Sequence, residues 1–285
     1  MGRDNILTFA VLCVFHDWTL GVDSKMVHLH QPGLNSSISL DMVVDSVDDM
    51  YDGCTKQMYN KVEVEKEGYL VHENKEPFKN AWKLAESCAK KVKERFREDS
   101  SEYNVDDKLS HNHIKAICAY TAGHPSIHSE FNHAVRTSRY KYTTSFQFHS
   151  LHFLLTDAIR LLKKQQQHCN TTYRRTKMKF VGKVNTTIRF GYFASSSLNK
   201  DNSEFGDKSC FEIETCFGAY LKSFPKMGKK EEEVLIPPYE VFTVTEVLKK
   251  EDDPTLWCDV VNKLQSTKIP KSNLNCKIFK KPFIN

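Results

Sequence analysis

Three groups of side chains in this sequence have the types that chemistry on a phosphorylated sugar requires. They are Arg174 in "TYRRT", serines 195–197 near the end of "IRFGYFASSSL", and glutamates 231–233 directly before the apolar run "VLIPP". A guanidinium can grip phosphate through two parallel hydrogen bonds, and hydroxyls at a strand end can bind a ribose. Paired carboxylates that face a cleft can stabilise an oxocarbenium-like transition state and steer the nucleophile.

The acidic triplet is the least ordinary of these groups. If it enters a strand, alternation places Glu231 and Glu233 on one face and points Glu232 away from that face. Three like charges before a strand can also be a solvated cluster and nothing more, because a short motif is only a hypothesis until its context is known. The rest of the chain has to supply that context.

The hydrophobic pattern divides the chain into a helical part and a stranded part. In "FKNAWKLAESCAKKVKERF" and "FQFHSLHFLLTDAIRLLKK" apolar residues recur every three or four positions, which is typical of core-facing helices. From about residue 168 the period shortens toward two, as in "CFEIETCFGAYL" and "EVLIPPYEVFTVTEVL". This order predicts an α+β fold, with a helical N-terminal half packed on a mostly antiparallel β-sheet core that carries the cleft. The polar stretch after Lys249, interrupted by Pro254 and Pro270, is predicted to be a loop.

Composition indicates one globular domain behind a targeting segment. The chain has 285 residues, 40% hydrophobic and 27% charged, and its formal charge of +5 is spread along its length, so nucleic acid is not an expected partner. The apolar run "ILTFAVLCVF" predicts a secretory signal peptide and a secreted, extracellular protein. We divide the chain into a signal peptide (1–21), an extended segment (22–39), a single domain (40–276, helical over 40–167 and β-rich over 168–248) and a tail (277–285). No later segment is apolar enough to cross a membrane, and "CKIFKKPFIN" lacks the hydrophobic tail of a lipid-anchor signal.

Cysteines and sequons fit an oxidising compartment. Of nine cysteines, loss of Cys13 with the signal peptide leaves 9 − 1 = 8, an even number that suggests disulfides. No pair has C-x-x-C spacing, so a zinc knuckle is not expected. Three sequons, at Asn35, Asn170 and Asn185, are candidate glycosylation sites.

Two histidine groups invite a metal-binding interpretation that the sequence does not support. His111-Asn112-His113 spells a nuclease-like "HNH", but it begins the predicted helix "HNHIKAICAYT" with no second metal-binding cluster nearby. His149 and His152 lie one helical turn apart without an acidic or cysteine partner at a recognised spacing. We therefore expect hydrogen-bonded or solvated helix histidines and no metal. A Gly-rich nucleotide loop is also missing from the sequence, so a bound nucleotide would be held by other devices.

Together, the motifs resemble those of the vertebrate ecto-mono-ADP-ribosyltransferases, an arginine-modifying family with an Arg, Ser, Glu-x-Glu signature. The family's Y-R-G-T is similar to residues 173–176, its R-F-G-x-F-x-S-x-S-L to residues 189–198, and its E-x-E-V-L-I-P to residues 231–237. The stretches "SLDMVVDSVDDMYDGC", "ETCFGAYL" and "SNLNC" add further similarity, so the likeness spans about residues 40–276.

The resemblance implies a glycosyltransferase that moves ADP-ribose from NAD, or the related NADP, to arginine side chains of extracellular or lumenal acceptor proteins, without a metal. Arg174 would bind the NAD phosphate, Ser195 would support the nicotinamide ribose, and Phe205 would stack on nicotinamide. Glu233 would be the catalytic glutamate that stabilises the oxocarbenium, and Glu231 would orient the incoming guanidinium. An acceptor arginine is protonated in water, so it needs a carboxylate beside it in order to act as a nucleophile.

The resemblance also implies two disulfides, Cys54–Cys276 and Cys169–Cys216. The motifs assign no partner to the other cysteines, and we expect Cys88 and Cys118 to be buried thiols unless helix packing brings them together. Arg175 stands where the family has glycine, and a bulky cation there is expected to crowd the cleft or distort the turn. Val47 stands where phenylalanine is usual.

Two other functions stay open from the sequence. One is NAD glycohydrolysis, in which water replaces arginine, and the other is an inactive secreted or surface binding protein that keeps the fold. We expect the protein to be a monomer.

Overall fold

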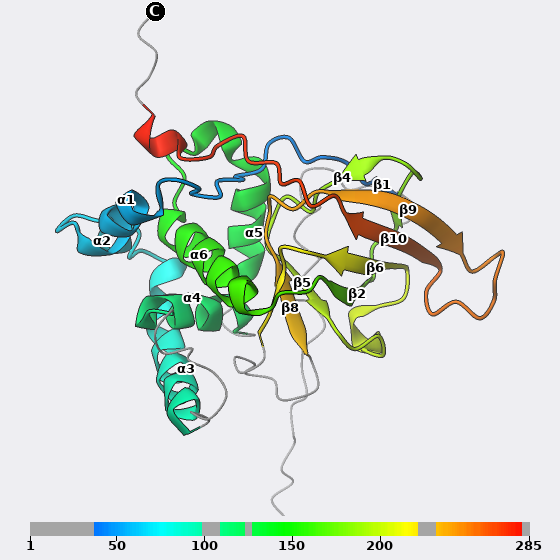
Figure 1. Cartoon of the computed structure of the whole chain (residues 1–285), viewed down its shortest axis with the longest axis horizontal. Coiled ribbons are helices and arrows are strands. Elements are labelled where there is room, and N and C mark those ends of the chain that lie inside the picture. Colours follow the sequence, from blue (N-terminus) through cyan, green and yellow to red (C-terminus); the bar gives the residue numbers. More distant parts are fainter. Residues whose placement is uncertain (1–36, 99–108, 123–126, 222–231, 281–285) are drawn as a thin grey trace, which may run out of the picture.

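The structure, a computed structural model, describes residues 37–98, 109–122, 127–221 and 232–280. The predicted signal peptide, Asn35 and Glu231 lie outside these residues. Among the described residues the principal helices are α1 Thr55–Tyr59, α2 Tyr69–His72, α3 Phe78–Glu98, α4 His111–Thr121, α5 His128–Thr137 and α6 His149–Gln165. They gather at one side of the molecule and the strands at the other, with α5 and α6 next to the sheet (Figure 1).

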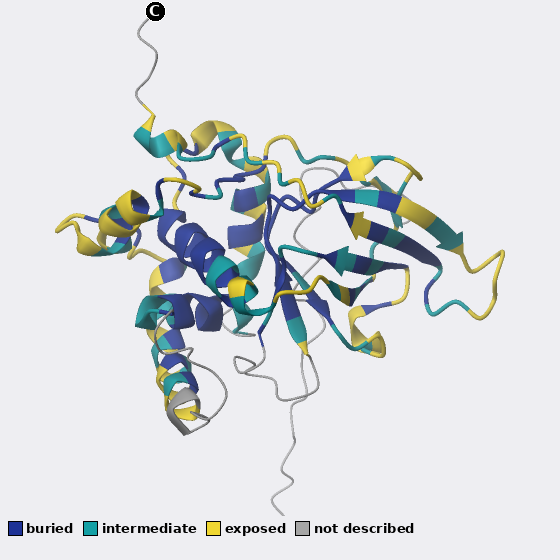
Figure 2. Cartoon of the chain, in the orientation of Figure 1, coloured by how far each residue is buried: buried dark blue, intermediate teal, exposed yellow. Residues whose placement is uncertain are grey.

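Helix positions follow from the apolar periodicity and from the caps. In α3 the buried residues Phe78, Ala81, Ala85, Ala89 and Val92 recur every three or four positions, as the sequence predicts. Helix α4 begins with a reciprocal cap, in which the Ser110 hydroxyl accepts from the His113 amide and the His113 ring accepts from the Ser110 amide. Helix α6 is buried along most of its length (Figure 2), as a helix between two layers must be.

The first turn of α6 is capped by a carboxylate from a distant part of the chain. Glu73 accepts the backbone N–H groups of His149 and Ser150 at 2.6 and 2.8 Å. These N–H groups have no partner within their own helix, so the buried carboxylate satisfies them. Burial also raises the pKa of Glu73 to about 7.

The strands form a two-stranded and an eight-stranded sheet among the described residues. The large sheet has the order β4-β9-β10-β6-β2-β5-β8-β7, and β1 pairs with β3 in the small one. The bounds are β1 Ile38–Ser39, β2 Asn170–Thr176, β3 Phe180–Val181, β4 Thr187–Ile188, β5 Ala194–Ser197, β6 Ser209–Thr215, β7 Ala219–Tyr220, β8 Glu233–Ile236, β9 Phe242–Lys249 and β10 Val260–Ser266. Within the large sheet only the β10–β6 pairing is parallel, so the predicted α+β class with a mostly antiparallel sheet is confirmed.

The interpretation of the chain after Lys249 as loop is wrong. Residues 260–266 form β10, which lies inside the sheet between β9 and β6. Val260, Asn262 and Leu264 alternate on a buried side of this strand. The strand is largely polar by composition, and it becomes regular because pairing with two neighbours satisfies its backbone.

A buried ion pair fastens the N-terminal segment to the C-terminal segment. Arg189 contacts Asp48 at 2.7 Å, with side chains 1% and 0% exposed, and Asp48 also accepts the Leu274 amide at 3.0 Å. The motif "DSVDDMYDGC" therefore serves the junction between the segment before α1 and the last described segment, which run side by side in Figure 1. Neighbouring Asp49 accepts hydrogen bonds from the Tyr142 hydroxyl and the Cys276 amide.

Eight cysteines form four disulfides in the described residues: Cys54–Cys276, Cys88–Cys118, Cys169–Cys216 and Cys210–Cys258. The first and third are those that the resemblance implies. For Cys88 and Cys118 the stated exception holds: the packing of α3 against α4 brings the two sulfurs together, so they form a disulfide and are not free thiols. Within the described residues, no helix is both long and apolar enough to cross a membrane.

Candidate active site

Three adjacent strands bring together the polar groups that the sequence places far apart. The sheet order β2-β5-β8 makes neighbours of the strands that carry Arg174, Ser195 and Glu233. Ser197 lies directly across from Glu233 in the β5–β8 register, and Tyr173 lies across from Ser197 in the β2–β5 register. The acidic triplet thus has the context that its motif alone lacked.

Arg174 is held by the strand next to it. Its guanidinium donates from Nη1 to the backbone oxygen of Ser195 at 2.6 Å. The residue is 8% exposed and lines a pocket together with Arg136 and Arg189. A guanidinium fixed in this way presents its remaining N–H groups in a defined direction, which suits recognition of phosphate.

The hydroxyls of the serine cluster have different surroundings. Ser196 donates to the backbone oxygen of Val234 at 3.1 Å, and Ser197 accepts the Asn199 amide at 2.9 Å. Ser195 is half-buried, and its hydroxyl has no hydrogen-bond partner among the described residues. Of the three, Ser195 is therefore the hydroxyl best placed to meet a ligand.

Glu233 begins β8, and its neighbour Glu232 does not continue the strand. Glu233 is half-buried, and its backbone oxygen accepts the Leu221 amide at 2.8 Å. Glu232 is exposed, as expected, but its backbone has φ +41°, in the left-handed region. Simple strand alternation therefore does not extend back across Glu232. Glu231, the second carboxylate of the predicted pair, lies outside the described residues.

Sequence reasoning missed a buried phenol beside these charges. Tyr120, at the end of α4, donates to the backbone oxygen of Phe193 and accepts from the Asn132 amide at 2.9 Å. Burial raises the pKa of Tyr120; the Asn132 hydrogen bond lowers it, the charge of Glu233 raises it, and that of Arg174 lowers it. Tyr120 therefore lies within electrostatic reach of both groups and, staying protonated, supports the start of β5. Nothing in "AICAYT" distinguishes this tyrosine from an ordinary core residue.

Arg136, on α5, is a second residue that sequence reasoning missed. Its Nη1 donates to the backbone oxygen of Phe190 at 3.0 Å, and its guanidinium lies 5.9 Å from the centroid of the Tyr192 ring. It lines the same pocket as Arg174. Two guanidinium groups at one pocket suit a diphosphate better than a single phosphate.

Phe205 lies on the connection between β5 and β6 and outside that pocket. It ends the short 3₁₀ helix Ser203–Phe205 and is 42% exposed. The next residue, Gly206, has φ +117°, and a Cβ there would lie 2.6 Å from the Lys177 backbone nitrogen. Glycine is needed at this position because the connection presses against the end of β2.

The expectation that Arg175 crowds the cleft or distorts a turn is wrong. Arg175 lies inside the regular strand β2, where successive side chains point to opposite faces. Arg174 lines the pocket, whereas the Arg175 guanidinium stacks on the indole of Trp257, with 4.6 Å between Cζ and the ring centroid. A strand needs no glycine here, and the long side chain has room on the other face.

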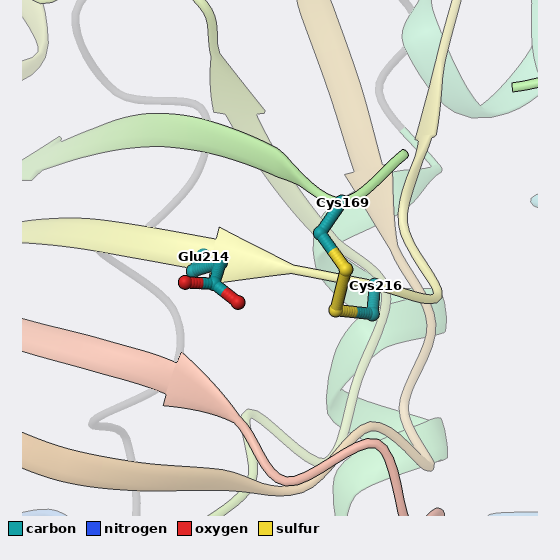
Figure 3. Close-up of side chains that lie close together, drawn as sticks. All are labelled: Cys169, Glu214 and Cys216. Carbon is teal, nitrogen blue, oxygen red and sulfur yellow. A yellow bond between two sulfur atoms is a disulfide. The ribbon is translucent and has the colours of Figure 1, made fainter. Parts of the chain in front are cut away.

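The histidines and a cysteine group resemble metal ligands but have other partners. His113 caps α4, His111 pairs with Glu86 at 3.2 Å, and His152 hydrogen-bonds the Tyr51 hydroxyl at 2.7 Å. His149 is buried, and burial is the main cause that lowers its pKa to about 3. Cys169, Cys216 and Glu214 lie close together, but the two sulfurs are bonded to each other (Figure 3) and offer no thiolate to a metal.

Comparison with known proteins gives one consistent result. The sequence profile described as "NAD:arginine ADP-ribosyltransferase" matches residues 40–266. The chain is 33% identical over 250 residues to the T-cell ecto-ADP-ribosyltransferase 1 of Mus musculus, covering 86% of this chain and 79% of the relative. It is 32% identical over 261 residues to the GPI-linked NAD(P)(+)--arginine ADP-ribosyltransferase 1 of Mus musculus, covering 85% and 73%.

Solved structures agree with this. A mutant of the eucaryotic mono-ADP-ribosyltransferase ART2.2 in complex with NADH superposes with a TM-score of 0.67 and 32% identity, covering 84% of this chain and 98% of that one. A second ART2.2 mutant, in complex with NAD, gives a TM-score of 0.65 and 30% identity over the same shares.

Proposed function

The chain belongs to the NAD:arginine ADP-ribosyltransferase family, and from that premise we propose that Arg174, Ser195 and Glu233 carry out the reaction at the β2-β5-β8 site. The activity is NAD-dependent mono-ADP-ribosyl transfer to arginine. The observation that supports the assignment is the meeting of these three residues on adjacent strands, with Arg174 bonded to the Ser195 backbone and Glu233 across from Ser197. Their order in the sequence does not require this meeting.

In the proposed mechanism NAD is the substrate, and its diphosphate lies against Arg174 and Arg136. The bond between the nicotinamide nitrogen and the ribose carbon C1′ breaks, and nicotinamide leaves with the electron pair. Glu233 stabilises the oxocarbenium that forms on the ribose, and Ser195 supports the same ribose. A carboxylate already aimed at the developing charge needs no rearrangement during the step.

The acceptor's guanidinium nitrogen then forms the new bond to C1′ and loses one proton. We assign Glu231 to orient this guanidinium and draw it toward the ribose. The support for this role is the Glu-x-Glu spacing, since Glu231 itself lies outside the described residues. A guanidinium is a weak nucleophile while protonated, so an adjacent carboxylate favours transfer over hydrolysis.

We place the protein outside the cell, as a secreted glycoprotein and a monomer, with the domain at residues 40–276. The support is the predicted signal peptide, the four disulfides and the ecto and GPI-linked names of the relatives. Between the two described sequons, Asn185 is the better glycan acceptor because it lies exposed in a turn. The side-chain nitrogen of Asn170 is buried.

Labelled NAD and a pair of acceptor peptides test this function. One peptide contains arginine and the other has lysine in its place, and free ADP-ribose is measured in the same reactions. We expect label on the arginine peptide only, and Glu231→Gln should abolish labelling while free ADP-ribose continues to form. Release of ADP-ribose without labelling by the wild type would indicate a glycohydrolase. NAD that neither reacts nor raises the melting temperature would indicate an inactive binding protein.

A further inference from the structure

The side chain of Arg175 joins the sheet to two loops. Its Nε donates to the backbone oxygen of Lys200 at 2.9 Å, and its Nη1 donates to the backbone oxygen of Trp257 at 3.3 Å. The Lys200 ammonium lies over the same indole, 5.1 Å from its centroid. Arg175 and Lys200 therefore both contact Trp257, and the guanidinium bridges the two loops.

One of these loops, residues 198–208, carries Phe205. Its ends are fixed by backbone bonds, from Leu198 to Glu232 at 3.1 Å and from Lys208 to Thr176 at 3.1 Å. The Arg175 bond to Lys200 adds a side-chain anchor between these ends. A loop with this anchor has fewer conformations to lose when a ligand packs on it.

The other loop is itself fixed to the sheet, which makes Trp257 a firm platform. Cys258, the next residue, is bonded to Cys210 in β6. The Asp259 amide donates to the backbone oxygen of Asp207 at 2.8 Å, which ties this loop to the Phe205 loop as well. Trp257 thus has little freedom to move away when Arg175 stacks on it.

We propose that Arg175 is a positioning residue that holds the Phe205 loop in the geometry for binding the nicotinamide end of NAD. The inference rests on the proposed function and on the role that the family resemblance implies for Phe205, which is to stack on nicotinamide. It assigns a role to the residue that replaces the family's glycine, since a glycine has no side chain to reach Lys200. The Arg175–Trp257 stack and the Cys210–Cys258 bond support that role together.

Steady-state kinetics of Arg175→Ala and Arg175→Lys test the role. We call the contacts of Arg175 with Lys200 and Trp257 the clamp. Loss of the clamp should raise KM for NAD about five- to tenfold, because NAD must then order the loop itself and the free energy of binding is reduced by that cost. The value of kcat should stay within about twofold of wild type. Arg175→Lys keeps the charge but not the planar fork, so its KM should lie between those of the wild type and the alanine variant. Inhibition by nicotinamide should weaken in parallel, whereas inhibition by ADP-ribose, which lacks that ring, should not change.

Arg139→Ala is the matched control. Arg139 also donates to a backbone oxygen, that of Val44 at 2.9 Å, and lies over an aromatic ring, Tyr140, at 5.9 Å, but it touches neither loop through these contacts. Hydrogen exchange of residues 199–206 without NAD should accelerate in Arg175→Ala and not in Arg139→Ala. Unchanged exchange, or an unchanged KM and nicotinamide inhibition, overturns the proposal. If the wild type does not turn over NAD, the proposed function fails, and the exchange rates alone decide whether the clamp exists.

Discussion

The buried centre around Asp48 and Arg189 and the β2-β5-β8 site around Arg174 and Glu233 use the same residue types in opposite ways. Arg189 donates to Asp48 and to the backbone oxygens of Met42, Val43 and Lys271, all at 2.7–3.0 Å. Its side chain is 1% exposed, and that of Asp48 is fully buried. At the β2-β5-β8 site, Glu233 and Ser195 are only half-buried, and the Ser195 hydroxyl has no hydrogen-bond partner among the described residues.

This difference shows that the surroundings of a guanidinium and a carboxylate decide whether the two groups stabilise the fold or act on a ligand. At the chain junction all three nitrogens of the Arg189 guanidinium donate to acceptors of the protein, so the pair fixes two segments. At the β2-β5-β8 site Arg174 lines a pocket and Glu233 is half-buried. Residue type alone does not separate the two centres, but the accessibility of the carboxylate does: Asp48 is fully buried and Glu233 is half-buried.

Breaking the buried centre should have the largest effect, and on stability. Asp48→Asn leaves the Arg189 guanidinium buried without its counter-charge, so we expect unfolding in urea to be easier by about 4 kcal/mol. The matched control is Asp259→Asn, which removes the partner of Lys208 from an exposed pair of similar length, 2.9 Å. That variant should unfold at the wild-type urea midpoint. Equal midpoints for the two variants would contradict the distinction drawn here.

Changing the charge at the β2-β5-β8 site should affect catalysis and leave the stability of the fold unchanged. Glu233→Gln keeps the shape of the side chain but removes the charge that stabilises the oxocarbenium, so both transfer and NAD hydrolysis should fall about a hundredfold, or about 3 kcal/mol. Glu232→Gln serves as control, because Glu232 is exposed and should change turnover by less than about twofold. Full activity of Glu233→Gln, or equal losses in both variants, would remove Glu233 from the reaction.

A third prediction concerns pH and the helical half. Burial raises the folded-state pKa of Glu73 from 4.5 to about 7, so the protonated form is favoured by folding. Its contribution to stability is complete below pH 4.5 and is lost as the pH rises through about 7. Glutamine does not ionise, so the Glu73→Gln variant does not lose stability in this way. Between pH 5 and pH 8 its free energy of unfolding, measured in urea, should therefore rise by about 2 kcal/mol relative to that of the wild type.

The control for this pH effect is Glu251→Gln. The hydrogen bond from Lys249 lowers the pKa of Glu251, so its carboxylate stays ionised across the same range. The difference in stability between this variant and the wild type should not change from pH 5 to pH 8. A parallel pH dependence in both variants would show that the Glu73 carboxylate titrates normally in the folded protein.

The smallest predicted effect sharpens the comparison within the pocket. Arg174→Lys keeps the positive charge but loses the planar fork and the second phosphate contact that the fork allows. We expect KM for NAD to rise about tenfold, or about 1.4 kcal/mol, with the fold unchanged by circular dichroism. An unchanged KM would mean that Arg174 acts through its bond to the Ser195 backbone and not on phosphate.

The sequence predicted best those elements that local spacing determines. Helix α3 and helix α4 begin and end where the apolar periodicity places them, because an amphipathic stripe is repeated every turn. The grouping of Arg174, Ser195 and Glu233 was predictable from motif resemblance, although their closeness depends on strand order, which periodicity does not determine.

What the sequence could not predict depends on contacts between distant segments. Strand β10 becomes regular by pairing with β9 and with β6, and β6 lies far away in the chain, so the polar composition of β10 alone predicts a loop. The Cys88–Cys118 bond depends on how α3 packs against α4, and Tyr120 becomes part of the site only when β5 passes the end of α4. From the sequence, the replacement of the family's glycine by Arg175 predicts an obstructed cleft. The structure shows instead that Arg175 stacks on Trp257 at the other face of β2.

The Cys54–Cys276 bond joins residues with a sequence separation of 222 and turns almost the whole domain into a covalent ring. A protease that cuts the ring once cannot release a fragment, because both new ends remain attached through the sulfur bridge. In an oxidising medium, a singly nicked molecule would therefore migrate on a gel as one species and separate into pieces only after reduction. This ring gives the domain tolerance to single proteolytic cuts without any change in the strength of its core.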